Sequence, residues 1–139
     1  MLLPALMAMS LLGCASHDDL TVWKESFPSP DGSWVATAQT VQNGGFGSAS
    51  IDTSVVLQRT GGKESTLVLS LACDGPLVHP YKLDNIANRG GSVELIVRWL
   101  DGAHLHLTFQ NHPRIQSVRS SVGPVVVQVE DRSGERHAL

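Results

Sequence analysis

The sequence predicts an all-β domain, an antiparallel sandwich or small barrel of about seven to eight strands that follows an N-terminal signal segment. Two observations support this prediction. Apolar segments of five to ten residues, rich in Val, Leu, Thr and Trp, alternate with turn signals such as Pro-Asp-Gly, Gly-Gly and Asp-Gly. No later segment shows the periodicity of a long helix, and a run of short strands without helices folds as a sandwich or a barrel.

Length and composition limit the possibilities further. The 139 residues leave room for one domain with a single core. The hydrophobic fraction of 42%, the charged fraction of 17% and the net charge of -3 argue against disorder and against a basic surface for nucleic acid.

Four strands are expected in the first half of the chain, and each is bounded by a turn signal. Proline and Asp-Gly break the first from the second, a glycine-rich stretch follows the second, and Gly61-Gly62 follows the third. The stretch Ser-Pro-Asp-Gly-Ser-Trp resembles the turn-and-strand signature of exported β-propeller blades and of several small exported lipoproteins, but a single copy excludes a propeller. The expected strands are 21–27, 33–42, 51–59 and 65–72.

The second half contains the strongest hairpin signal. Strands 92–100 and 103–109 are expected to join at Asp101-Gly102, a pair favoured where both central residues need a positive φ. Apolar and polar residues alternate along 103–109, which predicts a strand with one buried and one solvent-exposed face. Residues 81–88 are expected to form one or two helical turns, 122–130 another strand, and 132–134 a turn before a short terminal strand.

The N-terminus has the pattern of an export signal. Residues 2–12 are apolar except for Ser10, too short for a permanent membrane helix, although basic residues are absent before them. The segment ends in Leu11-Leu12-Gly13-Cys14, which is similar to the lipobox of bacterial lipoproteins. The resemblance implies cleavage between Gly13 and Cys14 and a diacylglyceryl group on the Cys14 thiol. This covalent lipid is the only cofactor expected, and it anchors the protein in a membrane.

The resemblance also implies a domain organisation and a location. Residues 1–13 are the signal peptide, 14–20 a lipidated tether and 21–139 the β-domain. In the family an aspartate directly after the cysteine favours inner-membrane retention, whereas Ala15 and Ser16 follow here. The expected location is therefore the cell envelope, on the outer membrane facing the periplasm. A disulfide between Cys14 and Cys73 is excluded if the first sulfur carries lipid, which leaves Cys73 as a small buried hydrophobic residue.

Three histidines form a candidate metal site. His104 and His106 share one face of the expected strand and His112 lies just beyond it. Zinc would need a further ligand, for example Asp101, Asp84 or His79. The alternative is that these histidines are the wet face of an ordinary half-buried strand.

The glycine-rich stretch is a candidate partner-binding loop. It comprises Asn43, Gly44, Gly45, Phe46 and Gly47, and Phe46 is the expected contact residue. It lacks the Lys-Ser/Thr ending of a phosphate-binding loop. No G-x-S-x-G motif or other catalytic signature is present, so no catalytic residue is predicted.

These observations predict a lipid-anchored, non-enzymatic envelope protein that binds a protein partner or has a structural role. One alternative is an inhibitor or immunity-type binder of an envelope-active enzyme, with the glycine-rich loop inserted into the active site. The other is a periplasmic metal-binding protein that uses His104 and His106.

Overall fold

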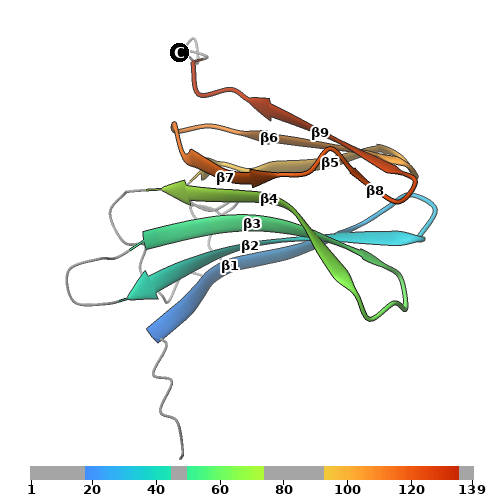
Figure 1. The fold of residues 1–139 in the computed structure, drawn as a ribbon, viewed down its shortest axis with the longest axis horizontal. Coiled ribbons are helices and arrows are strands. Elements are labelled where there is room, and N and C mark those ends of the chain that lie inside the picture. Colours follow the sequence, from blue (N-terminus) through green and yellow to red (C-terminus); the bar gives the residue numbers. More distant parts are fainter. Residues whose placement is uncertain (1–17, 45–49, 74–92, 135–139) are drawn as a thin grey trace, which may run out of the picture.

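The computed structural model describes residues 18–44, 50–73 and 93–134. These residues form two sheets that pack face to face (Figure 1), which confirms the all-β sandwich. The first sheet has the order β1-β2-β3-β4-β7 and the second has the order β5-β6-β9-β8. Their bounds are β1 Asp18–Pro28, β2 Trp34–Gly44, β3 Ser50–Arg59, β4 Ser65–Cys73, β5 Ile96–Asp101, β6 His104–Phe109, β7 Arg114–Val118, β8 Ser121–Val122 and β9 Val125–Asp131.

The five-stranded sheet begins as a meander of neighbouring antiparallel strands. Along β3, inward residues alternate with half-exposed ones, and the inward set is Ile51, Thr53, Val55 and Leu57. Thr40 lies directly opposite Thr53, and their buried hydroxyl oxygens are 2.7 Å apart. This hydrogen bond offsets the cost of two polar groups inside the core.

One core joins the two sheets. It includes Trp23 and Trp34 from the larger sheet and Leu105, Leu107 and Phe109 from the smaller one. Trp23 and Trp34 are 4% and 8% exposed, so both side chains serve packing. Within the described residues, no helix has the length and apolar character needed to cross a membrane.

The strands differ from the sequence prediction in number and in one pairing. The described residues form nine strands, because 122–130 is divided by a turn at Gly123, whose φ is 54°, and because β7 was not predicted. The pairing of β6 with β9 is parallel, and the other pairs are antiparallel. After β6 the chain first forms β7 in the opposite sheet, so β9 does not return through a hairpin and is free to run parallel.

The start of the domain also differs from the prediction. Asp18, Asp19 and Leu20 were assigned to the tether, but they belong to β1 and pair with residues at the end of β2. These three residues are therefore not part of the predicted tether. The expected helical turns at 81–88 and a terminal strand after residue 134 lie outside the described residues.

Candidate functional site

The turn between β1 and β2 is held by an aspartate. Asp31 Oδ1 accepts hydrogen bonds from Ser29 Oγ at 2.7 Å, Ser33 Oγ at 2.7 Å and Ser33 N at 3.1 Å. The Ser29 hydroxyl, followed by the two Ser33 donors, lowers the pKa of Asp31 to about 2, because these bonds favour the charged carboxylate. Ser29 Oγ also accepts from Trp34 N at 3.0 Å. The Ser-Pro-Asp-Gly-Ser-Trp stretch therefore closes the turn with its own side chains.

The turn of the β5–β6 hairpin lies against this aspartate. A Cβ atom on Gly102 would be 2.6 Å from Asp31 Oδ2, closer than real atoms approach. The φ of Gly102 is outside the left-handed region, and Asp101 is not among the residues with positive φ. The prediction that Asp101 and Gly102 need positive φ is therefore wrong. Glycine leaves room here for a carboxylate of the other sheet.

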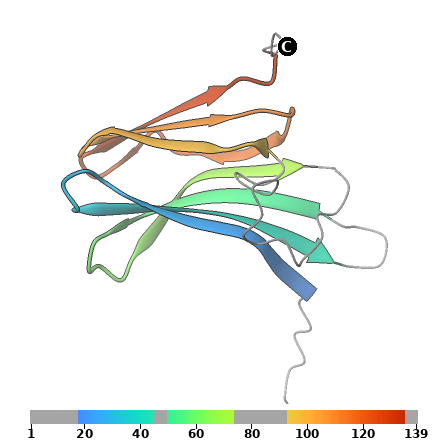
Figure 2. The same cartoon turned by 180° about the vertical axis from the view of Figure 1, so that it is seen from behind.

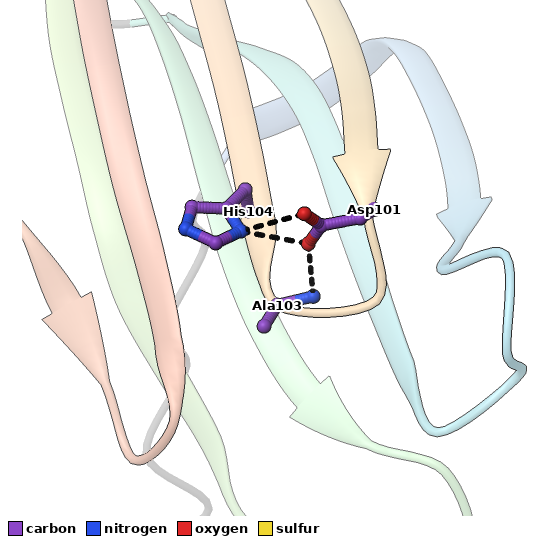
Figure 3. Close-up of polar contacts among 3 residues, drawn as sticks. All are labelled: Asp101, Ala103 and His104. Carbon is purple, nitrogen blue, oxygen red and sulfur yellow. Dashed lines mark hydrogen bonds and ion pairs between the residues drawn. The ribbon is translucent and has the colours of Figure 1, made fainter.

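The β5–β6 hairpin also positions His104, the first of the three predicted histidines, beside Asp101 (Figure 3). Asp101 Oδ1 accepts from Ala103 N at 2.8 Å, and His104 Nδ1 lies 2.7 Å and 2.9 Å from the two carboxylate oxygens. The bond from Ala103 N, and then the bond from His104, lower the pKa of Asp101. Both side chains are exposed. Asp101 and His104 thus hold the hairpin turn closed from the surface.

His106 lies on the outer face of the four-stranded sheet, two residues after His104 on β6. Its Nε2 is 3.1 Å from Glu130 Oε2 on β9, and Glu130 Oε1 is 3.4 Å from Arg132 Nε. Arg98 of β5 lies directly opposite His106. The outer face therefore carries a cluster of polar side chains from three neighbouring strands.

The predicted histidines do not share a partner. His104 and His106 face the same side of β6, but each bonds a different carboxylate. His112 lies after β6, has a φ of 51°, and donates its backbone N–H to Ser133 Oγ at 2.9 Å. Over the described ranges, no group of three His, Cys, Asp or Glu side chains could hold a metal ion. His79 and Asp84 lie outside these ranges.

The described part of the glycine-rich loop is tied to the ends of its strands. Asn43 and Gly44 are the last residues of β2. Asn43 Nδ2 donates to Asp52 Oδ2 at 2.6 Å and to Ser50 Oγ at 3.1 Å, so the Asn43 amide closes the mouth of the hairpin. Gly45, Phe46 and Gly47 lie outside the described residues, as do Gly13 and Cys14, and their predicted roles stay predictions.

A groove that the sequence did not predict lies between the edge strands β1 and β5. These strands belong to different sheets and lie on one side of the sandwich (Figure 2), where Trp99 Nε1 donates to Phe27 O at 2.9 Å. The groove has a volume of about 330 Å³. It is lined by Trp23, Glu25, Phe27, Glu94, Leu95, Ile96, Val97 and Gln110.

Two carboxylates, those of Glu25 and Glu94, are part of this lining. Neither Glu25 nor Glu94 has an ion-pair or hydrogen-bond partner among the residues that the structure describes. Glu94 also has a φ of 49°, in the left-handed region that a residue with a Cβ adopts at a cost. Glu94 falls within the expected strand 92–100, whereas β5 begins only at Ile96.

Comparison of the chain with models of protein families, with curated proteins and with solved structures finds no match.

Proposed function

We propose that this protein is a lipid-anchored envelope protein that binds a protein partner without catalysing a reaction, and that the β1–β5 groove is its binding site. The groove is the main observation that supports this proposal. Its volume of about 330 Å³ falls in the range of ligand sites, and an apolar floor with a few polar groups is the usual lining of such sites. The lipobox resemblance at Cys14 supports the anchor.

The lining specifies the chemistry of the partner. Trp23 and Phe27 on β1, Val97 on β5 and Leu95 just before it offer apolar contacts. The carboxylates of Glu25 and Glu94, which bond none of the described residues, give the groove a negative charge. The complementary ligand is a segment of a protein that presents an apolar side chain next to a Lys or Arg side chain. A cation beside an aromatic ring gains an additional attraction.

Photo-crosslinking in cells tests the groove. A crosslinking amino acid at position 94 is expected to give one defined adduct, whereas the same amino acid at Gln128, on the exposed outer face of β9, gives none. For the charge test the crosslinker is placed at Ile96, so that position 94 is free for substitution. With the crosslinker there, the double change Glu25→Lys and Glu94→Lys is expected to lower the adduct yield at least about tenfold relative to the otherwise unchanged protein, since opposite charges become like charges.

The matched control is Glu64→Lys, which reverses an exposed carboxylate in the β3–β4 turn, outside the groove lining. Its adduct yield from position 96 should equal that of the unchanged protein. Equal adduct yields with and without the Glu25→Lys and Glu94→Lys changes would overturn the groove as the binding site.

The lipid anchor makes a separate prediction. Palmitate labelling of the full chain is expected, and Cys14→Ala is expected to abolish both the label and membrane recovery, because the thiol is the attachment point that the resemblance implies. A Cys73→Ala chain is the control and should label normally. Equal labelling of the Cys14→Ala chain would refute the anchor while leaving the groove untouched.

A further inference from the structure

The outer face of the four-stranded sheet contains a small pocket with a positive charge. It has a volume of about 160 Å³ and is lined by Ile96, Arg98, His106, Thr108 and Arg132. Strand pairing brings these residues together, because Ile96 lies opposite Thr108 and Arg98 lies opposite His106 in the β5–β6 pair. Directly opposed residues of an antiparallel pair project on the same face, about 5 Å apart.

The positive charges of this pocket are only partly compensated. Glu130 alone serves two groups, since it bonds His106 and contacts Arg132 Nε at 3.4 Å. Arg98 has no ion-pair or hydrogen-bond partner in the described part of the chain. The one carboxylate beside the pocket therefore contacts Arg132 but not Arg98.

Arg132 adds a second sign of an incomplete site. Its Nε atom is buried and makes no hydrogen bond, although it lies within ion-pair distance of Glu130 Oε1. The two observations agree, because a contact at 3.4 Å can be close enough for attraction and too poorly aligned for a hydrogen bond. A buried donor without an acceptor favours any ligand that supplies one.

From these contacts we infer that the pocket formed by Arg98, His106, Thr108 and Arg132 binds a phosphate group. Guanidinium groups match phosphate oxygens in a bidentate geometry, and a hydroxyl such as that of Thr108 can donate to a further oxygen. A phosphate has enough acceptors to serve both arginines, which the single carboxylate of Glu130 does not. The volume of about 160 Å³ suits one such group and is below the range of sites for larger ligands.

A phosphate group can come from solution or from a lipid headgroup, and the chemistry at Arg98 is the same. The pocket adjoins the β1–β5 groove but differs from it in its polar lining, because Arg98, His106, Thr108 and Arg132 do not line the groove. Ile96 lines both, so it is left unchanged in the test.

The test uses the full chain with Cys14→Ala, so that no acyl chain contributes. Sodium phosphate is added at constant ionic strength against sodium chloride, and backbone amide NMR shifts are followed. Saturable shifts are expected at Arg98, His106, Thr108 and Arg132. Arg98→Gln is expected to weaken the apparent affinity at least about tenfold, since it removes charge-assisted hydrogen bonds. Its melting temperature should not change, because Arg98 is exposed and bonds none of the residues that the structure describes.

The matched control is Arg114→Gln, which removes an exposed arginine of β7 in the other sheet and should keep the full affinity. Shifts that do not saturate, or equal affinities for Arg98→Gln and the parent, would overturn the proposal. Flotation with phosphatidic acid vesicles then separates the sources. Vesicle binding that needs Arg98 identifies a headgroup phosphate, and saturable phosphate binding without vesicle binding identifies a soluble one.

Discussion

Replacing Leu71 with alanine is expected to lower the free energy of unfolding by about 2–5 kcal/mol, while the same change at Ile115 costs less than about 1 kcal/mol. The two residues lie directly opposite each other in the β4–β7 pair, so their side chains project on the same, inward face of the sheet. Leu71 is fully buried, whereas Ile115 is 52% exposed. The difference between the two variants therefore measures how far the smaller sheet covers the larger one.

The physical reason is the unequal size of the sheets. Four strands face five. At one side Trp99 of β5 bonds Phe27 of β1, and at the other β8 contacts β4, which leaves β7 as the less covered edge among the described strands. Val118, the other apolar residue of β7, is 49% exposed as well. Truncating a buried leucine leaves a cavity, but truncating a half-exposed isoleucine removes little buried area.

Urea unfolding of the parent, Leu71→Ala, Ile115→Ala and Val118→Ala chains provides the measurement. Equal slopes against urea concentration show that the variants can be compared directly. If Ile115→Ala destabilised the protein as much as Leu71→Ala does, the edge at β7 would have to be covered in solution, for example by another copy of the chain.

The strands that could be predicted from sequence are those in which burial alternates without interruption. Along β3 the period of two is complete from Ile51 to Leu57, so the strand, its face and its place in the core all followed from local pattern. In β7 the two apolar residues, Ile115 and Val118, are separated by two polar ones, so the sequence does not alternate. Both can still face the core because the β4–β7 register shifts between them. The bulge destroys the alternation, and this strand was missed.

The turns show a different limit. The Gly-Pro pair at 123–124 is a strong break signal that could have divided the predicted strand 122–130. Gly102 could not have been understood locally, because its neighbour is Asp31 in the turn of the other sheet. A turn signal indicates that a glycine is needed, but only the fold shows whether the reason is backbone conformation or the approach of another side chain.

The candidate sites depend on the fold in the same way. The His104 and His106 pattern correctly placed two imidazoles on one strand face, but their partners Asp101 and Glu130 come from the hairpin turn and from β9. The groove lies between β1 and β5, which belong to different sheets and are adjacent only because the two sheets pack on each other. Local pattern carries no information on that stacking, so neither the groove nor the cluster around Arg98 was predicted.

The contact between the two turns leads to a second stability prediction. Gly102→Ala is expected to lower the free energy of unfolding by about 1–3 kcal/mol, the usual range for an added methyl group without space. The new Cβ would be 2.6 Å from Asp31 Oδ2 and 2.9 Å from its Cγ. The carboxylate cannot simply rotate away, because its other oxygen accepts three hydrogen bonds from Ser29 and Ser33.

A double-mutant cycle with Asp31→Ala separates this clash from a general effect of alanine in a turn. In the Asp31→Ala background the Cγ and both carboxylate oxygens are gone, so Gly102→Ala should cost less than about 0.5 kcal/mol. Gly134→Ala is the matched control, since an added Cβ there meets nothing within 4 Å and the φ of Gly134 is not left-handed. An equal cost of Gly102→Ala with and without Asp31 would mean that the two turns do not meet. The packing of the β1–β2 turn on the β5–β6 hairpin would then have to be abandoned.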